Sequence, residues 1–223
     1  KKRGYPGLVG DEGGFAPKML NNEKTIQLII DAIKAAGYKP GSDVKLGLDL
    51  AASEFYDPKS ATYALNPGKK AVTPSQMIDQ LSVWVRTYPL TLIEDGLSED
   101  DWKAWKALTK KLSAKATLVG DDLFVTNVER LRRGFDEKVA NAILIKLNQI
   151  GSLTETIDCI LEAQKHHYTV IVSHRSGDTA DTTIADLAVA VNAEYIKTGS
   201  LSRSERVEKY NRLMDIEREL RKS

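Results

Sequence analysis

Short apolar runs alternate with amphipathic stretches along most of the 223-residue chain. The apolar runs predict strands at 8–10, 44–50, 90–93, 117–119, 142–147, 169–172 and 195–196. Apolar positions at helical spacing predict helices at 25–36, 101–112, 128–135, 156–166, 183–191 and 204–221, and a further helix that starts at the capping box Thr73–Gln76. Strands that alternate with helices in this way form parallel βαβ units.

This alternation predicts an α/β fold, and two architectures fit it. Seven predicted strands are one fewer than a closed (β/α)₈ TIM-type barrel contains, so the chain would form an incomplete barrel. The alternative is an open doubly wound sheet, although no GxGxxG sequence follows a first strand. Both architectures bind ligands at the carboxyl ends of their strands. The stretch 54–70 carries the turn signals Asp57-Pro58 and Asn66-Pro67-Gly68, which predict a surface hairpin or loop.

Lys146 lies near the end of an otherwise apolar predicted strand, Ala142 to Leu147. An ammonium group there costs several kcal/mol unless something compensates for its burial. One interpretation is a strand end at which the lysine reaches water. The other is a buried general base. The choice depends on which charges the other strands bring to the same end of the sheet.

Acidic residues follow three of the predicted strands directly. Asp49 ends one strand, Glu94 and Asp95 end the next, and Asp121 and Asp122 follow the third. Each acid alone could cap the next helix. Because neighbouring strands lie about 5 Å apart, three carboxylates at one edge would repel each other unless a cation neutralised them. Oxygen ligands favour Mg²⁺ over zinc.

Two other loops and one more strand end complete this candidate site. Glu12 lies among glycines, where the backbone can approach a ligand closely. His174, Arg175 and Ser176 follow a predicted strand and could clamp a phosphate or a carboxylate, although a structural role for His174 is an equal alternative. Lys197 adds a cation at another strand end. Together these groups suit proton abstraction next to a carboxylate.

Composition narrows the class of protein further. The net charge is +1, from 32 basic and 31 acidic residues that are interleaved, so no nucleic-acid surface is expected. The one cysteine, Cys159, excludes an internal disulfide framework and is expected in the core. No apolar run is long enough to cross a membrane. The charged residues of the last helix are expected to form a solvated face.

Several motifs, in order along nearly the whole chain, resemble those of the enolase family in a bacterial-like version. They are Gly10-Asp11-Glu12-Gly13-Gly14-Phe15-Ala16-Pro17, Leu48-Asp49, Ile93-Glu94-Asp95-Gly96, Val119-Gly120-Asp121-Asp122-Leu123, Ile145-Lys146-Leu147-Asn148-Gln149-Ile150-Gly151, Ser173-His174-Arg175-Ser176-Gly177 and Lys197-Thr198-Gly199-Ser200. The resemblance implies that residues 1–223 are the C-terminal catalytic barrel domain of an enolase, a glycolytic lyase. The reaction would be the Mg²⁺-dependent, reversible dehydration of 2-phosphoglycerate to phosphoenolpyruvate.

The resemblance also implies a role for each candidate residue. Lys146 would remove the C2 proton and Glu12 would protonate the departing C3 hydroxyl. Enolases are themselves a standard case of a lysine base beside Mg²⁺, so this assignment comes from the resemblance. The ligands of the tighter of two Mg²⁺ ions would be Asp49, Glu94 and Asp121. The substrate would be held by His174, Arg175, Ser176 and Lys197.

Enolases also contain an N-terminal α+β lid domain and a first barrel strand before the Gly10-to-Pro17 motif, and both are absent here. We therefore expect a fragment that is inactive alone. The resemblance further implies a cytoplasmic homodimer or higher homo-oligomer. A non-catalytic role is the alternative, with plasminogen at a cell surface or an RNA-degrading assembly as partner, and the segment Phe55 to Lys59 is a candidate exposed loop for the former. A dehydratase or racemase of the same superfamily is disfavoured by the phosphate clamp.

Overall fold

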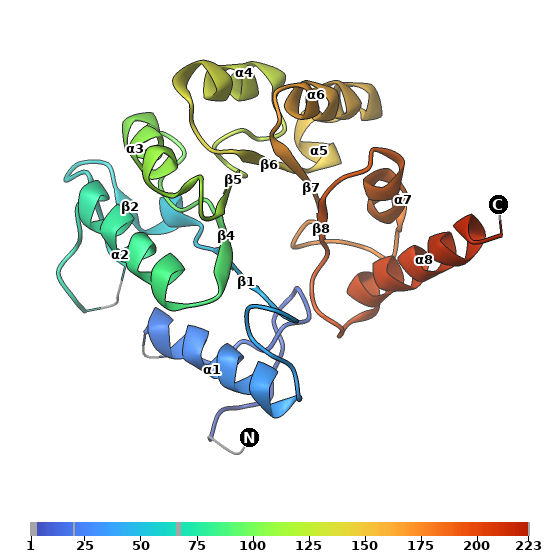
Figure 1. The fold of residues 1–223 in the computed structure, drawn as a ribbon, viewed down its shortest axis with the longest axis horizontal. Helices are drawn as coiled ribbons and strands as arrows, with labels where there is room; N and C mark the ends of the chain where they lie inside the picture. The colour runs from blue at the N-terminus through green and yellow to red at the C-terminus, as the bar shows by residue number, and fades with distance from the viewer. Residues whose placement is uncertain (1–3, 20, 66–67, 223) are drawn as a thin grey trace.

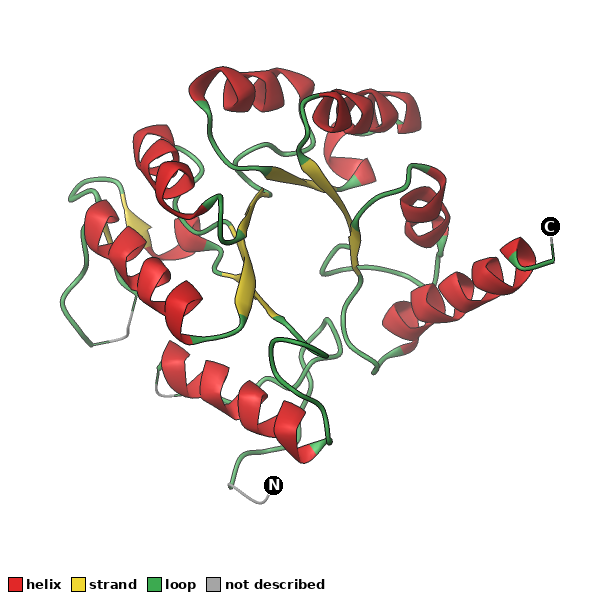
Figure 2. Ribbon diagram, in the orientation of Figure 1, coloured by secondary structure: helices red, strands yellow, loops and turns green. Residues whose placement is uncertain are grey.

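The computed structural model describes residues 4–19, 21–65 and 68–222. Six parallel strands of the described residues form one sheet, in the order β1, β4, β5, β6, β7, β8. They are Leu46–Asp49, Leu90–Glu94, Thr117–Gly120, Ala142–Ile145, Thr169–Ser173 and Tyr195–Lys197. The sheet curves into part of a barrel with the helices on its outer side (Figures 1 and 2). The predicted incomplete (β/α)₈ barrel is confirmed.

The helices of the described residues follow the strands in the expected alternation. They are α1 (Asn22–Ala35), α2 (Pro74–Thr87), α3 (Trp102–Leu112), α4 (Val128–Glu137), α5 (Leu147–Ile150), α6 (Leu153–Lys165), α7 (Thr183–Ala190) and α8 (Ser204–Leu220). The capping box at Thr73 and Gln76 is present, with Pro74 at the first helical position. The single turn α5 was not predicted. No helix among the described residues is long and apolar enough to cross a bilayer.

The prediction of a seventh strand at Leu8–Gly10 is wrong. Val9 forms only an isolated antiparallel bridge with Phe15, and the described part of the chain contributes six strands to the parallel sheet. The cause is local: the Gly10 amide donates to the Gly14 carbonyl at 2.9 Å and turns the chain back on itself. An apolar pair beside such a turn pairs with its own neighbours instead of extending into the sheet.

The hairpin prediction for 54–70 is confirmed by β2 (Tyr56–Asp57) and β3 (Thr62–Tyr63), which pair antiparallel after the 3₁₀ turn η1 (Ala52–Phe55). The predicted turn at Asn66 and Pro67 lies outside the described residues. The expectation that the whole loop from Phe55 to Lys59 is exposed is wrong. The rings of Phe55 and Tyr56 both pack against the buried ring of Tyr63, so within this loop residues 57–59 are exposed and the two aromatic residues are half-buried.

Alternation along the strands divides the interior into two layers. In β6, Ile143 and Ile145 belong to the large core between the sheet and the helices, which also contains Cys159. Ala142 and Leu144 belong to a second cluster built from strand residues only. Successive strand side chains point to opposite faces. The second cluster therefore lies on the inner, concave face of the sheet.

Candidate active site at the carboxyl ends of the strands

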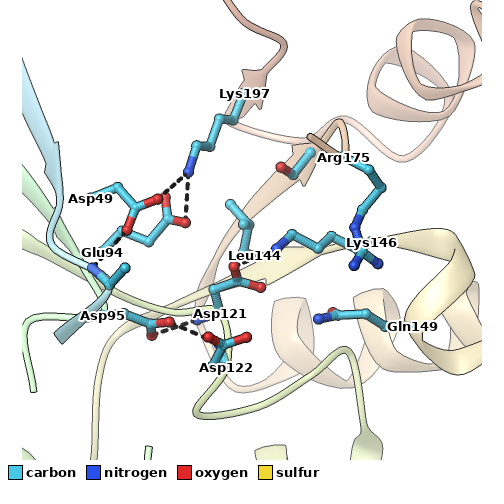
Figure 3. Close-up of polar contacts among 12 residues, drawn as sticks. Asp49, Glu94, Asp95, Asp121, Asp122, Leu144, Lys146, Gln149, Arg175 and Lys197 are labelled. Carbon is cyan, nitrogen blue, oxygen red and sulfur yellow. Dashed lines mark hydrogen bonds and ion pairs between the residues drawn. The ribbon is translucent and has the colours of Figure 1, made fainter. Parts of the chain in front are cut away.

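The inner face continues past its apolar layer into charged residues. On three neighbouring strands, the residue two positions beyond an inner-face apolar side chain is charged: Leu92 precedes Glu94, Val119 precedes Asp121, and Leu144 precedes Lys146. Because strand side chains alternate with a period of two, all three charged groups point to the same side of the sheet. Their convergence is visible in Figure 3.

Lys197 joins the two edge strands of the sheet. Its ammonium nitrogen lies 2.8 Å from Asp49 Oδ2 on β1 and 2.8 Å from Glu94 Oε1 on β4 (Figure 3). Burial lowers the pKa of Lys197, but the carboxylates of Glu94 and Asp49 outweigh burial and hold this pKa above its ordinary value. Lys197 is therefore a charged group that links β8 to β1 and β4.

Glu94 is almost completely buried beneath this ion pair. Burial raises the pKa of Glu94 to about 8, Lys197 counteracts that rise, and the nearby Asp49 adds to it. Burial also raises the pKa of Asp121, although the Lys146 ammonium works against it. Both acids are therefore held in an environment that favours added positive charge.

Lys146 sits directly beyond β6 and forms an ion pair with Asp121. Only 15% of the Lys146 side chain is exposed. Its backbone amide donates to the buried hydroxyl of Thr126 at 2.9 Å, and this hydroxyl also contacts Gln149 Oε1 at 3.0 Å. Lys146 therefore borders the cavity at the end of its strand, and its mostly buried side chain turns inward to a carboxylate.

Asp95 has a structural role that its place in an acidic pair did not reveal. Its backbone has a φ of +40°, and its carboxylate accepts hydrogen bonds from the amides of Asp121 (3.0 Å) and Asp122 (2.9 Å). Burial raises the pKa of Asp95 to about 7, although the two amide donors favour its charged form. Asp95 thereby fixes the backbone that carries Asp121 (Figure 3).

Glu12 and His174 meet on the other side of the site. Glu12 Oε1 lies 3.4 Å from His174 Nε2, and the Glu12 carbonyl accepts the Ser200 amide at 2.8 Å. Gly13 permits this close packing, because its φ is +76° and an added Cβ would stand 2.1 Å from the Ser202 carbonyl oxygen. Burial lowers the pKa of His174 to about 4, and Glu12 partly opposes this shift. His174 is therefore a neutral imidazole at physiological pH.

Arg175 and Ser176 lie exposed at the rim. The Arg175 guanidinium donates to Asn148 Oδ1 at 2.6 Å, and the Arg175 amide donates to Asp178 Oδ2 at 3.0 Å. Asp178 in turn pairs with the buried Lys209 at 2.8 Å. Asp178 and the buried Lys209 thus hold the backbone of the Arg175–Ser176 segment, while its guanidinium and hydroxyl groups stay accessible to a ligand.

One cavity of about 500 Å³ collects these groups. Eight of the nine predicted site residues line it, namely Glu12, Asp49, Asp121, Lys146, His174, Arg175, Ser176 and Lys197. The ninth, Glu94, is buried just beneath the cavity, where it pairs with the cavity-lining Lys197. The cavity is therefore lined by carboxylates, by an arginine and a serine at the rim, and by the side chains of Lys146 and Glu12.

The family model for the enolase C-terminal TIM barrel domain matches residues 1–223. The chain belongs to this family. Family membership supports an enolase-like lyase at the level of the superfamily.

Enolase-family domains typically bind Mg²⁺, and two overlapping sets of acids here could hold a cation. Asp95, Asp121 and Asp122 each offer one oxygen, and these atoms lie within 4.8 Å of one another. However, both oxygens of Asp95 already accept backbone amides. In the set predicted from the sequence, Asp49 and Glu94 pair with Lys197, and Asp121 pairs with Lys146.

The donor set fits a hard cation. Asp121 Oδ1 is buried and has no hydrogen-bond partner among the described residues, so it is a carboxylate oxygen with a free lone pair. The set contains only oxygen ligands, and no cysteine or histidine joins it. Oxygen-only coordination is the preference of Mg²⁺.

The prediction that the charged residues of the last helix form only a solvated face is wrong. Arg206 and Lys209 on α8 are completely buried. Their cationic groups reach under the clamp segment, where Arg206 contacts His174 and Lys209 contacts Asp178. The sequence signal was present but weak: the two residues are three positions apart, on one face of the helix, in an otherwise charged stretch.

Proposed function

We propose that this enolase-family barrel supplies the catalytic residues for the reversible dehydration of 2-phosphoglycerate to phosphoenolpyruvate. The observation that supports this proposal best is the single cavity in which Lys146, Glu12 and the Arg175–Ser176 clamp face the carboxylates. A lysine and a glutamate on different walls suit removal of a proton from one carbon and loss of hydroxide from the next.

In the proposed reaction, neutral Lys146 takes the C2 proton of the substrate. Glu12 gives a proton to the C3 hydroxyl, which leaves as water, and a double bond forms between C2 and C3. The phosphate binds to Arg175 and Ser176 at the rim. Lys197 and His174 line the rest of the cavity wall.

The metal-binding residues in this proposal are Asp49, Glu94 and Asp121. When bound there, Mg²⁺ supplies positive charge that stabilises the substrate carboxylate as it gains electron density. The Lys146 ammonium pairs with Asp121. Lys146 must therefore leave Asp121 and lose its proton before it acts as a base.

The central test is Lys146→Ala in the native full-length polypeptide with Mg²⁺. We expect exchange of the C2 proton with deuterated solvent, followed by NMR, to be abolished, while Mg²⁺ binding measured by calorimetry is retained. The matched control is Lys110→Ala, on the outer face of α3, which should leave exchange unchanged. Exchange at the wild-type rate in Lys146→Ala would remove Lys146 from this role.

A second measurement tests the substrate class. Formation of phosphoenolpyruvate from 2-phosphoglycerate is followed by its ultraviolet absorbance. Exchange of the proton next to the carboxylate, followed by NMR in deuterated solvent, reports on hydroxy acids that lack phosphate. Because Arg175 and Ser176 are positioned for an anion, we expect turnover of the phosphorylated acid alone. Turnover of a phosphate-free acid would favour a dehydratase or racemase of the same superfamily.

A further inference from the structure

Arg206 is an arginine that uses every donor it has inside the protein. Its Nε and Nη2 donate to the Asp11 carbonyl oxygen at 3.3 and 3.0 Å. Its Nη2 also reaches the Ser176 carbonyl at 2.8 Å, and its Nη1 reaches the Arg175 carbonyl at 2.9 Å. The remaining Nη1 hydrogen faces His174 Nδ1 at 2.7 Å. The five N–H groups of a guanidinium are thus all engaged.

These contacts join the two segments that carry opposite walls of the cavity. Asp11 immediately precedes Glu12, whereas Arg175 and Ser176 form the clamp. The Arg206 side chain passes beside Gly199, where an added Cβ would stand 2.7 Å from Arg206 Cδ and 2.7 Å from the Glu12 carbonyl oxygen. With a φ of +80°, Gly199 leaves the space through which this guanidinium enters.

The contact with His174 determines where the imidazole proton lies. A guanidinium can only donate hydrogen bonds, so Nδ1 of His174 must be the acceptor. The proton of the neutral ring is therefore on Nε2. That nitrogen is buried, makes no hydrogen bond within the described residues, and lies 3.4 Å from Glu12 Oε1. The ring thus presents an N–H group to the residue proposed as proton donor.

We propose that Arg206 is a positioning residue that fixes His174 as the Nε2–H tautomer and holds the Glu12 segment against the Arg175–Ser176 clamp. The Nε2–H group of His174 lies 3.4 Å from Glu12 Oε1, and its partial positive charge attracts and orients the Glu12 carboxylate. Arg206 itself does not touch the cavity, since it is fully buried beneath these segments. The kinetic part of this inference rests on the proposed function, but the tautomer does not.

The charged groups around the His174 ring also indicate that Nδ1 stays unprotonated. Glu12 faces it from its loop, Arg206 from α8, Lys197 from β8, and Asp178 from the segment after β7. A second proton would have to enter at Nδ1, directly opposite the guanidinium. Removing the guanidinium opens that position to a proton.

The test uses the full-length polypeptide labelled with ¹⁵N-histidine and long-range ¹H–¹⁵N spectra of the imidazole rings. His174→Gln assigns the His174 signals. We expect the wild-type ring to carry its proton on Nε2, with Nδ1 unprotonated, from roughly pH 5 to pH 8. An Nδ1–H tautomer in the wild type would overturn the inference, and this result requires no variant to fold.

Arg206→Gln should release both constraints. We expect mixed tautomers or protonation of His174 within that pH range, a changed acidic limb in the pH profile of kcat, and a fall in kcat of about tenfold to a hundredfold. Arg206→Lys, which keeps the charge but not the fork, should recover the tautomer in part and kcat incompletely. An unchanged tautomer and pH profile in Arg206→Gln would overturn the inference.

The matched control is Arg212→Gln on the same helix. Arg212 pairs with Asp186 at 2.5 Å, so its removal also costs α8 hydrogen bonds to another element, but it contacts neither segment of the site. We expect an unchanged His174 tautomer and pH profile. If 2-phosphoglycerate is not turned over at all, the proposed function fails, whereas the tautomer result still decides the role of Arg206.

Discussion

Thr126→Val tests whether the backbone beside Lys146 is held by a single hydroxyl. Thr126 is completely buried, and its hydroxyl accepts the Lys146 amide at 2.9 Å and contacts Gln149 Oε1 at 3.0 Å. Valine has nearly the same shape but no hydroxyl. The substitution therefore leaves the Lys146 amide without its acceptor and adds no cavity.

The expected cost follows from that unpaired amide. A buried donor left without a partner costs about 1–3 kcal/mol, and the hydrogen bond from the Lys146 amide to Thr126 is only partly buried, which places this case near 1–2 kcal/mol. For a domain of this size, each kcal/mol lowers Tm by about 2–4 °C, so we expect a fall of about 2–8 °C. Displacement of the Lys146 ammonium should also lower kcat about tenfold or more.

Thermal unfolding, and C2 proton exchange in the full-length polypeptide, measure the two effects. Thr126 has a φ of +54°, which is strained for any β-branched residue, and valine keeps the same branching. The backbone strain is therefore matched between threonine and valine. Thr126→Ser retains the hydroxyl and should stay close to the wild type in both assays. A Thr126→Val protein with wild-type Tm and wild-type exchange would refute the argument that the hydroxyl positions Lys146.

Three further predictions concern packing, pH and metal. Gly120→Ala places a Cβ 2.6 Å from Phe124 Cδ2 and should cost about 1–3 kcal/mol in urea unfolding, whereas Gly47→Ala meets Leu92 at an ordinary 3.5 Å and should be milder; equal losses would contradict this reasoning. Burial lowers the pKa of His174 from 6.5 to about 4, so the unfolded chain binds a proton that the native state excludes. Stability should fall as pH drops through that window, and more steeply than in His174→Gln; parallel curves would contradict this. Mg²⁺ at about a hundred times its Kd should add about 2.7 kcal/mol of stability, a gain that chelation or Asp121→Asn removes; an undiminished gain in Asp121→Asn would exclude Asp121 as a ligand.

The local hydrophobic pattern predicted most of the strands and helices. The prediction failed where a turn or a very short helix overrode that pattern. Six of the seven predicted strands lie in the sheet, and each is a short apolar run. Leu8–Gly10 has the same composition, but the glycine turn that follows pairs Val9 with Phe15. The single turn α5 is too short to show helical periodicity, and Gly151 at a φ of +100° ends it.

The residues of the candidate site could be predicted from their positions at the ends of strands, but the residues that hold them in place could not. Asp49, Asp121 and Lys146 could be identified because they directly follow apolar runs. Asp95 and Arg206 act through backbone amides and carbonyls of distant segments, and no sequence pattern marks those partners. Periodicity shows that two residues share a helix face, but it does not show that this face lies beneath a catalytic loop.

The alternation of side chains along each strand links the packing of the barrel interior to the arrangement of the site. Leu144 lies in the inner apolar layer, and Lys146, two residues later, reaches the cavity above it, whereas Ile145 between them packs toward the helices. The same rule places Glu94 above Leu92. Because side chains alternate with a period of two, a shift of one residue in β6 would turn Lys146 into the helical layer and bury Ile145 among the carboxylates. The apolar residues that fill the barrel interior therefore also fix the direction of the charged residues, so packing and chemistry in this site share one register.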